Sequence, residues 1–436
     1  DAPSELSKLL GINPKQKIYL SDGGDSPQML VNRGAKAIAT GKSKAIVITG
    51  GEAAYSVYCE KKGKITLNWP KRKKHKYIEK KSQRYTTSFE NKYGLIYPSC
   101  TYAMFETAVR AASGRSVEQQ REYIGRLFEH YSKVASKNPF AWSQKAYTAE
   151  EIYTTSPKNR YIIHPYTKRM CSNMFVDQSA SLIMTSEEIA QTLKIDPNLW
   201  IYPMGGADFK NIYNITKRPK LYDSPAAREG SRLALWQAGL TLDDIDSFDI
   251  YSCFPSMVQI IMNEIGLTLN DPRNLTITGG LPYFGGPMSN YSMHAIIDAV
   301  KLIREDNSKK IMIVANGGYN TQQSFGVYGA EPPVISWNER NDSEIQQAIF
   351  SKSLPEPIEE AHSQITIEAY TIYYNRNGRP IRVIVSGCLQ NGCRTLALIE
   401  AKPEVLLELE QQELVGKTFP VHHDSRREQN LISFIE

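Results

Sequence analysis

The sequence Thr276-Ile-Thr-Gly-Gly-Leu-Pro-Tyr-Phe-Gly-Gly-Pro287 ends in a glycine pair, Gly285-Gly286, and a helical pattern of apolar residues follows it. These apolar residues recur at helical spacing from Met293 to Ile303, before the apolar strand Lys310-Ile-Met-Ile-Val-Ala315 and a further pair, Gly317-Gly318. A glycine pair before a helix lets the backbone turn tightly and brings helix N-terminal N–H groups close to whatever binds there. The pattern predicts an α/β unit with glycine turns at both ends.

A second unit of the same order lies near the start of the chain. Gly23-Gly24 precede a helical pattern from Met29 to Ala39, and the strand Ala45-Ile-Val-Ile-Thr49 and Gly50-Gly51 follow. The two segments favour a pseudo-repeat of two α/β halves. Each glycine pair taken alone is more typical of a structural turn than of a binding site. Their repetition favours binding.

A long insertion, from about Tyr55 to Asn173, separates the two halves. It contains the basic run Lys71-Arg-Lys-Lys-His-Lys76 and a charged helical stretch over 117–137. A block of like charges is usually a solvated loop. The alternative is that this run attracts the phosphates of a nucleotide-like ligand. A strand from Val176 to Thr185 then closes the first half.

The pattern of apolar and polar residues changes after about residue 350. The Pro- and Glu-containing segment 355–360 predicts a linker, and apolar and polar residues then alternate from Thr366 to Ile399. Turn signals at 375–378 and 390–392 interrupt this alternation, which is typical of antiparallel hairpins. We therefore expect three parts: a first half over 1–185, a second half over 186–350 and a small β-barrel over 363–436.

Composition excludes several classes of protein. The 436 residues are 41% hydrophobic and 22% charged, as in an ordinary globular protein, so disorder and coiled-coil architecture are excluded as the main theme. The apolar runs are too short to cross a bilayer. The net charge of +6 is mild for this length and makes nucleic acid an improbable partner. The six cysteines have no metal-ligand spacing, and they predict reduced thiols in the cytoplasm.

Three motifs stand in a fixed order: Phe248-Asp-Ile-Tyr-Ser-Cys-Phe-Pro-Ser256, the 276–287 segment and Val314-Ala-Asn-Gly-Gly-Tyr319. With the strand over 176–185, they resemble the thiolase superfamily. The resemblance is closer to the acetyl-CoA acetyltransferase or thiolase-like branch that carries an extra C-terminal small barrel, and it covers nearly the whole chain. It implies two similar α/β halves in a layered αβαβα arrangement, with the central helices face to face, plus an OB-like β-barrel.

One feature departs from this resemblance. In thiolases a complete strand, helix and strand unit precedes the first catalytic loop, whereas 22 residues precede Gly23 here. The first half is therefore expected to lack its first βαβ unit, with another chain covering the exposed sheet.

The resemblance also implies which residues should carry thiolase chemistry. That chemistry needs a nucleophilic cysteine at a helix N-terminus, a second cysteine as acid and base, an activating histidine and an oxyanion hole. The nucleophile's place falls at or near Gly24, the histidine's place is Gly286, and the loop 316–319 lacks the second cysteine. The polar anchor of the oxyanion hole becomes Tyr251. Because every one of these positions is altered, we do not expect the thiolase mechanism.

Three side chains remain as candidate catalytic groups, each with a structural alternative. Cys253 is either a residual nucleophile or a small buried hydrophobe. Ser26 is either a nucleophile or a helix N-cap, and His294 is either catalytic or a packing histidine. Trp142 and Tyr166 either hold a pantetheine or fatty chain or pack in the core.

The loops around the ancestral site supply the expected substrate-binding residues, together with the polar side chains of Asp22 and Asp25. The expected set is Gly23, Gly24, Tyr251, Ser252, Phe254, Gly285, Gly286, Asn290, Asn316, Gly317 and Gly318.

Two functions are consistent with these features. The first is an acyl-CoA-handling protein, an acetyl-CoA acetyltransferase homologue that works by an altered mechanism with Cys253 or a bound water. The alternative is a non-catalytic acyl-CoA-binding or scaffold subunit that works with a protein partner or as a homo-oligomer, with the barrel as the docking element. Coenzyme A or acyl-CoA is the expected ligand, and neither a covalent cofactor nor a metal is expected. Small barrels also bind oligonucleotides, but this one lacks the dense aromatic and basic interleaving that such binding needs.

Overall fold

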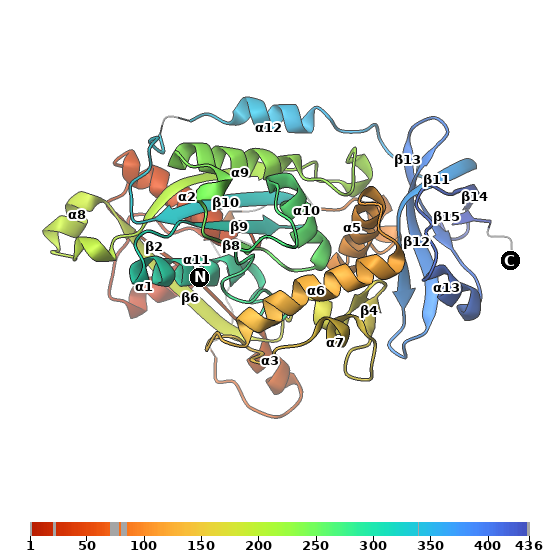
Figure 1. Cartoon of the computed structure of the whole chain (residues 1–436), viewed down its shortest axis with the longest axis horizontal. Coiled ribbons are helices and arrows are strands. Elements are labelled where there is room, and N and C mark those ends of the chain that lie inside the picture. The colour runs from red at the N-terminus through yellow and green to blue at the C-terminus, as the bar shows by residue number, and fades with distance from the viewer. Residues whose placement is uncertain (1, 21–22, 70–77, 80–84, 339, 434–436) are drawn as a thin grey trace.

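The computed structural model describes residues 2–20, 23–69, 78–79, 85–338 and 340–433. The α/β body occupies one end of the molecule and the C-terminal β-structure forms the other end, and the insertion's helices over 98–153 lie between them (Figure 1). The basic run 71–76 and Asp22 lie outside the described residues. Within the described part, no helix is both long and apolar enough to span a membrane.

The first half consists of α2 (Ser26–Ala39), β2 (Ala45–Ala53) and β6 (Asp177–Thr185). β2 and β6 pair antiparallel, from Ala45 opposite Thr185 to Ala53 opposite Asp177. Because side chains alternate along a strand, one face of this pair packs toward α2 and the other faces outward. On the outward face Val47 is 45% exposed and Ile183 is 76% exposed.

The second half contains a four-stranded sheet in the order β7 (Tyr202–Lys210), β10 (Gln322–Gly329), β9 (Ile311–Gly317) and β8 (Ser247–Ile250). β8 and β9 are parallel, whereas β10 runs antiparallel to both of its neighbours. α9 (Pro225–Ala238) packs on β7 and β10. It begins as its sequence predicts, because the Ser224 side chain accepts a hydrogen bond from the Ala227 N–H, and it ends at the left-handed Gly239.

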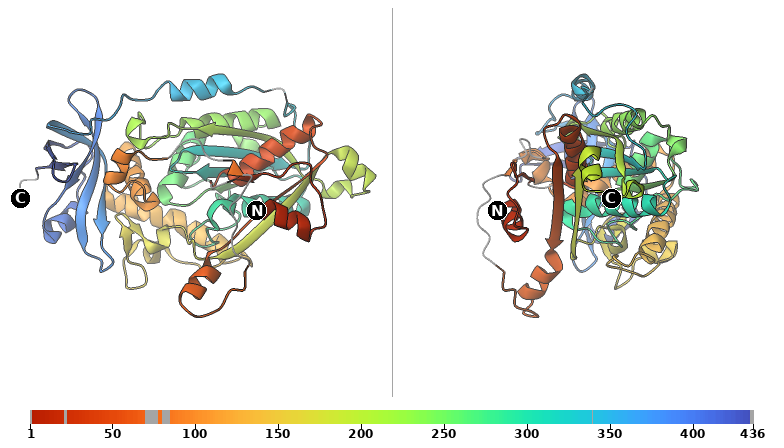
Figure 2. Two further views of the ribbon diagram at one scale, coloured as in Figure 1. Left: turned by 180° about the vertical axis from the view of Figure 1, so that it is seen from behind. Right: turned by 90° about the vertical axis from the view of Figure 1, so that its left-hand side faces the viewer.

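α2 and α11 (Tyr291–Glu305) lie side by side between the two sheets (Figures 1 and 2). Val31 of α2 and Met293 and Ile296 of α11 share one buried cluster with Ile48 of β2 and Ile313 of β9. The predicted repeat of glycine turn, helix and strand is therefore confirmed: the helix of each half packs on the helix of the other.

The insertion is mostly helical. Its elements are α3 (Ala54–Lys61), α4 (Ser88–Lys92), α5 (Pro98–Ala112), α6 (Val117–Ala135), α7 (Ala149–Tyr153), β4 (Tyr161–Ile163) and β5 (Tyr166–Thr167). Ahead of it, β1 (Tyr19–Leu20) pairs in parallel with β3 (Ile78–Glu79). α5 is buried on nearly all sides, because it packs against both α10 (Pro255–Ile265) and the C-terminal β-structure. The insertion thus joins the α/β body to the C-terminal domain.

The C-terminal part is a closed five-stranded barrel, as the hairpin signals predict. Its strands are β11 (Ser363–Tyr374), β12 (Pro380–Leu389), β13 (Arg394–Ile399), β14 (Thr418–Asp424) and β15 (Gln429–Ile432), closed in the order β11-β12-β13-β15-β14. α13 (Pro403–Leu409) packs against β12 and contributes Leu406 and Leu409 to the barrel's own core. The remaining helices, α1 (Ala2–Leu9), α8 (Glu187–Thr192) and α12 (Ser343–Phe350), lie outside the two sheets (Figures 1 and 2).

Buried polar contacts attach the barrel firmly to the body. The Arg394 guanidinium, 2% exposed, donates to the backbone carbonyls of Ile215 and Arg218 and pairs with Glu368 at 2.7 Å. Thr107 of α5 donates its hydroxyl to the Tyr370 carbonyl at 2.8 Å and accepts the Tyr370 N–H at 3.0 Å. Buried groups of this kind are costly to separate, so the barrel is an integral part of the fold.

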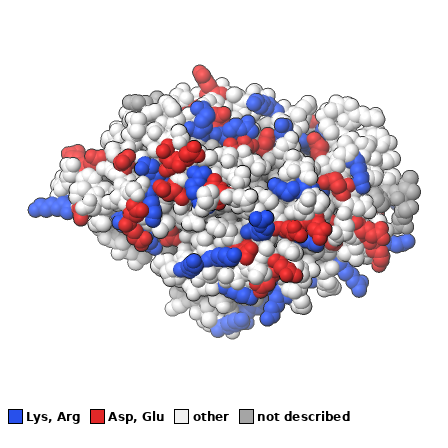
Figure 3. Space-filling model, viewed as in Figure 1, with Lys and Arg blue, Asp and Glu red and all other residues white. Residues whose placement is uncertain are grey.

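Acidic and basic side chains are interspersed over the face seen in Figure 3. This face shows no continuous stripe of one sign.

Candidate functional site

Four loops meet between α2, α11 and the end of β9. They are the loop before α2 (23–25), the loop after β8 (251–254), the loop before α11 (285–290) and the end of β9 (316–318). The Gly23 N–H donates to the Ser289 hydroxyl at 2.9 Å, and the Ser292 hydroxyl donates to the Gly24 carbonyl at 2.6 Å. The loops that the sequence singled out are therefore brought together.

Tyr251 fills the place next to Gly24. A β-carbon on Gly24 would overlap the Tyr251 hydroxyl and the Asn316 carbonyl oxygen. The Tyr251 ring is buried and packs edge-on against Tyr291, with 5.5 Å between ring centroids. No cysteine fits at position 24 in this arrangement, because its side chain and the tyrosine would occupy the same volume.

The place of the histidine and one position of the loop 316–319, which lacks the second cysteine, are closed in the same way. A β-carbon on Gly286 would overlap the Ser172 hydroxyl, and the Gly286 N–H is already bonded to the Asn173 carbonyl at 2.8 Å. A β-carbon on Gly318, whose φ is +67°, would overlap the ring of Tyr85. Neighbouring side chains thus occupy the space in which thiolase chemistry would place its functional groups.

Cys253 is present but is not activated. Its side chain is buried, and burial raises the pKa of the thiol to about 12, although a hydrogen bond with Tyr102 acts in the opposite direction. The nucleophilic form of cysteine is the thiolate. At neutral pH this residue is therefore a protonated thiol enclosed by protein.

His294 and Ser26 do not complete a catalytic pair. Burial lowers the pKa of His294 to about 4, and its ring packs against Phe284 at 5.3 Å. Its Nε2 has no hydrogen-bond partner among the described residues. Ser26 is the first residue of α2, and the N-cap position belongs to Asp25, so the expected N-cap role of Ser26 is wrong.

Two comparisons with known proteins show the family. Residues 344–426 match the family model described as "Thiolase-like protein type 1 additional C-terminal domain". The structure is similar to that of a monomeric SCP2-thiolase-like protein type 1 from Mycobacterium smegmatis, with 32% identity and a TM-score of 0.85. The match covers 99% of this chain and 86% of that chain. The chain belongs to the SCP2-thiolase-like protein type 1 family.

More distant structures share only the fold with this type 1 thiolase-like protein. An Ltp2-ChsH2(DUF35) aldolase is 20% identical with a TM-score of 0.52, over 71% of this chain and 78% of that chain. An acetyl-CoA acetyltransferase from Syntrophomonas wolfei is 14% identical with a TM-score of 0.51, over 76% and 84% of the two chains. A search of curated proteins gave no match.

Tyr102, which the sequence did not single out, lies at the centre of this type 1 thiolase-like site. It comes from α5 of the insertion and donates its hydroxyl to the Gly318 carbonyl at 2.9 Å. The same hydroxyl accepts from the Asn316 amide at 2.8 Å and from the Asn320 N–H at 3.0 Å. Gln323 donates in turn to the side-chain oxygens of Asn316 and Asn320. The amide of Asn316 is therefore already bonded within the protein.

The other predicted site residues also make structural contacts. Ser252 accepts from the Leu281 N–H at 3.1 Å, and Asn290 donates to the Gly50 carbonyl at 2.7 Å. Phe254 stacks on Tyr102 and on Tyr166, with centroid distances of 4.9 and 5.4 Å. The remaining two glycines of the set are also enclosed. A β-carbon on Gly285 would overlap the Gln178 side chain, and one on Gly317 would overlap the Asp25 side chain.

The two aromatic residues considered for an acyl chain differ from each other. Tyr166 is fully buried and bonded to Glu106 at 2.7 Å and to Ser256 at 2.8 Å, which makes it a core residue. Trp142 is 40% exposed and packs edge-on against Tyr55 at 5.1 Å. Only Trp142 is accessible from outside.

Asp249 anchors the loop after β8. Its Oδ2 accepts from the hydroxyls of Thr276 and Thr278, both at 2.9 Å, and its Oδ1 accepts from the Tyr291 hydroxyl at 2.9 Å. Burial raises the pKa of this carboxyl, while the hydrogen bonds act against that effect. Asp249 thereby ties β8, the 276–278 loop and the start of α11 together. Within the described residues, no three His, Cys, Asp or Glu side chains are grouped as metal ligands would be.

Proposed function

We propose that this protein binds acyl-CoA thioesters and does not turn them over by the Cys–His mechanism of thiolases. One observation carries the negative half of the proposal: Tyr251, Ser172 and Tyr85 occupy the space that side chains at positions 24, 286 and 318 would need. The thiolase-like fold carries the positive half, and not the N–H groups of Gly23 and Gly286, which are already bonded to Ser289 and Asn173. The acetyl-CoA acetyltransferase among the structural neighbours supports the same ligand class.

An acyltransferase built on Cys253 is the less favoured reading. A thiol with a pKa of about 12 is almost wholly protonated at neutral pH, and the buried side chain offers little access to a thioester carbon. His294, whose pKa is lowered by burial, packs on Phe284.

Calorimetric titration with coenzyme A, acetyl-CoA and a longer acyl-CoA tests the binding half. We expect saturable binding of at least one of them, with the ligand recovered unchanged. Absence of binding at millimolar concentration would overturn the proposal. Tyr373→Ala, on the barrel, is a control variant that leaves the four loops untouched.

A scaffold role beside a second protein is the alternative, and the outward face of the β2–β6 pair favours it. Val47 and Ile183 are large apolar side chains on this face and are exposed. Exposed apolar patches of this kind often mark interfaces. The neighbouring aldolase structure is described with two proteins, Ltp2 and ChsH2(DUF35). The M. smegmatis relative is described as monomeric. Light scattering at several protein concentrations tests self-association. The mass of a monomer at every concentration would exclude a homo-oligomer. We place the protein in the cytoplasm, which fractionation of cells would test.

A further inference from the structure

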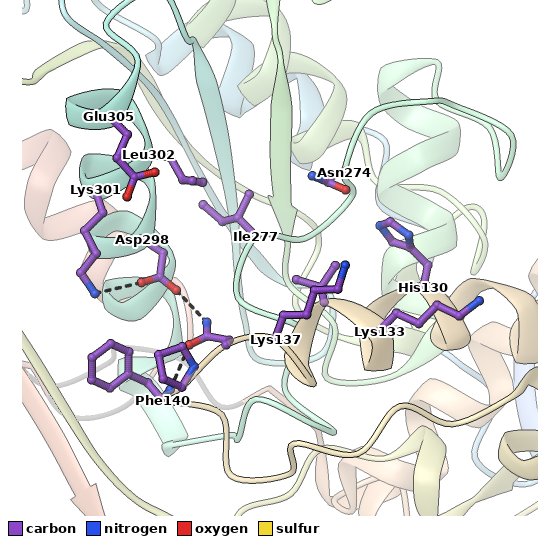
Figure 4. A pocket seen from close by; sticks show the side chains of 13 residues that line it. His130, Lys133, Lys137, Phe140, Asn274, Ile277, Asp298, Lys301, Leu302 and Glu305 are labelled. Carbon is purple, nitrogen blue, oxygen red and sulfur yellow. Dashed lines mark hydrogen bonds and ion pairs between the residues drawn. The ribbon is translucent and has the colours of Figure 1, made fainter.

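A cavity of about 660 Å³ lies between α6 and α11, away from the four loops of the ancestral site (Figure 4). The segment from Asn274 to Ile277 forms its third side. Cavities that hold small ligands typically measure roughly 300–1,000 Å³. This cavity has the size of a small-molecule site, and the proposed acyl-CoA site does not include it.

One part of the cavity is apolar. Val134 of α6, Ile277 of the loop and Leu302 of α11 contribute its aliphatic wall, and Phe140 stands at its edge. These side chains lie on three separate segments of the chain, which the fold holds in place through buried neighbours such as Ala135 and Ile303. A hydrocarbon group that packs against this wall is removed from water, which favours binding.

The other part carries polar groups that point toward one another. The His130 ring of α6, the Lys137 amine just after the end of α6 and the Asn274 amide of the loop approach the same region (Figure 4). Lys137 forms no ion pair with any residue that the structure describes. The Nε2 of His130 is buried and lacks a hydrogen-bond partner within the same part of the chain. Buried polar atoms are normally bonded, so this arrangement is suited to an acceptor from outside the protein.

The remaining charges at the cavity are largely paired. Lys301 lies 3.4 Å from Asp298, which also accepts from the Asn138 amide at 3.0 Å, and Lys133 pairs with Glu129 at 2.8 Å. Glu305 lies at the opposite end of the cavity from Lys137 (Figure 4). The free positive charge of the cavity is therefore concentrated at Lys137, next to His130.

We propose that this cavity binds a small carboxylate with an aliphatic or aromatic body. The carboxylate meets the Lys137 amine, His130 and Asn274, and the body lies against Val134, Ile277 and Leu302. Burial and the nearby Lys133 lower the pKa of His130, so the ring is neutral in the empty cavity. An anion beside it favours the protonated ring and raises that pKa. The proposal stands independently of acyl-CoA binding, because it uses none of the four loops.

Three probes of one length test the charge requirement: hexanoate, hexylamine and 1-hexanol, titrated by calorimetry into the full chain at neutral pH. Hexanoate is expected to bind with a dissociation constant of about a millimolar or below, as its size allows. The amine and the alcohol should bind at least about tenfold more weakly, because the protonated amine is repelled by the lysine and the alcohol, although its oxygen can accept a hydrogen bond, carries no negative charge. No measurable binding of hexanoate, or equal binding of hexylamine, would overturn the proposal.

Two lysine variants four positions apart in the sequence locate the site. Lys137→Met should weaken hexanoate binding by roughly tenfold, because it removes one charged hydrogen bond. Lys133→Met is the matched control: its amine points away from the Lys137 amine and is paired with Glu129, so binding should change less than about threefold. Both lysines are exposed, and urea unfolding checks that each variant keeps its fold. Equal binding to the wild type and Lys137→Met would overturn the assignment. Hexanoate should also raise the His130 pKa measured by NMR, and an unchanged pKa with bound hexanoate would place the ligand elsewhere.

Discussion

The hydroxyl of Tyr251 lies where a side chain on Gly24 would have to begin. The two residues are 227 positions apart in the sequence, and the tyrosine leaves room only for glycine at position 24. A thiolase-like fold can therefore keep its loops in place while a tyrosine fills the space that the nucleophile's side chain would need.

Enlarging Gly24 should destabilise the protein. Gly24→Ala forces the new methyl group against Tyr251 and the Asn316 carbonyl, and we expect a loss of about 1–3 kcal/mol in the free energy of unfolding, measured in urea. Gly34→Ala on the same helix is the control, since its nearest neighbour would be the Met184 sulfur at 3.2 Å. It should change stability by less than about 1 kcal/mol. Tyr251→Ala removes both the hydroxyl and the ring carbon that the new methyl group would meet, so it should reduce the penalty of Gly24→Ala, and equal penalties in both backgrounds would contradict the overlap.

Cys253 should resist alkylation. Burial raises its pKa to about 12, so iodoacetamide at pH 8 meets almost no thiolate at this residue. Cys393, which is partly exposed on the barrel, serves as the internal reference. Peptide mass spectrometry should find Cys393 modified well before Cys253, and both modified after unfolding. Equal rates in the native protein would show that Cys253 is open to reagents.

Glu410 should make the protein less stable as the pH rises. Burial raises its folded-state pKa from 4.5 to about 7, while Arg121 acts in the opposite direction. The unfolded chain therefore releases this proton first, and stability falls between about pH 4.5 and 7. Glu410→Gln should remove that loss, so the variant should exceed the wild type by about 1–2 kcal/mol at pH 8 and match it near pH 4. Parallel pH profiles for the two proteins would contradict this assignment.

Arg394 should be needed to hold the barrel on the body. Arg394→Met leaves the carbonyls of Ile215 and Arg218 without their donor, and we expect a loss of about 2–4 kcal/mol in urea unfolding. Arg376→Met, at the exposed hairpin tip, should change stability by less than about 0.5 kcal/mol. Similar small effects of both variants would show that the barrel is held by apolar packing alone.

Local signals predicted much of the fold. The helical periods after Gly23 and Gly285 predicted α2 and α11. These features depend on residues close together in the sequence, and turn and capping chemistry acts over the same short range. The resemblance added the layered arrangement of the two halves.

The contents of the site could not be predicted in the same way. Tyr102 bonds to Asn316, 214 positions away, and no local pattern in α5 marks it for that role. The overlap between Gly24 and Tyr251 likewise depends on where β8 ends, because Tyr251 directly follows its last residue, Ile250. Contacts of this kind are set by tertiary packing, which a single sequence does not reveal.

The most direct test of the central claim is thiolysis of acetoacetyl-CoA by coenzyme A, followed by product analysis, with wild-type protein and Cys253→Ala side by side. The filled places at positions 24, 286 and 318 predict no turnover above the rate without protein in either sample. Turnover by the wild type that Cys253→Ala abolishes would contradict the account, because it would show that the buried thiol is a working nucleophile.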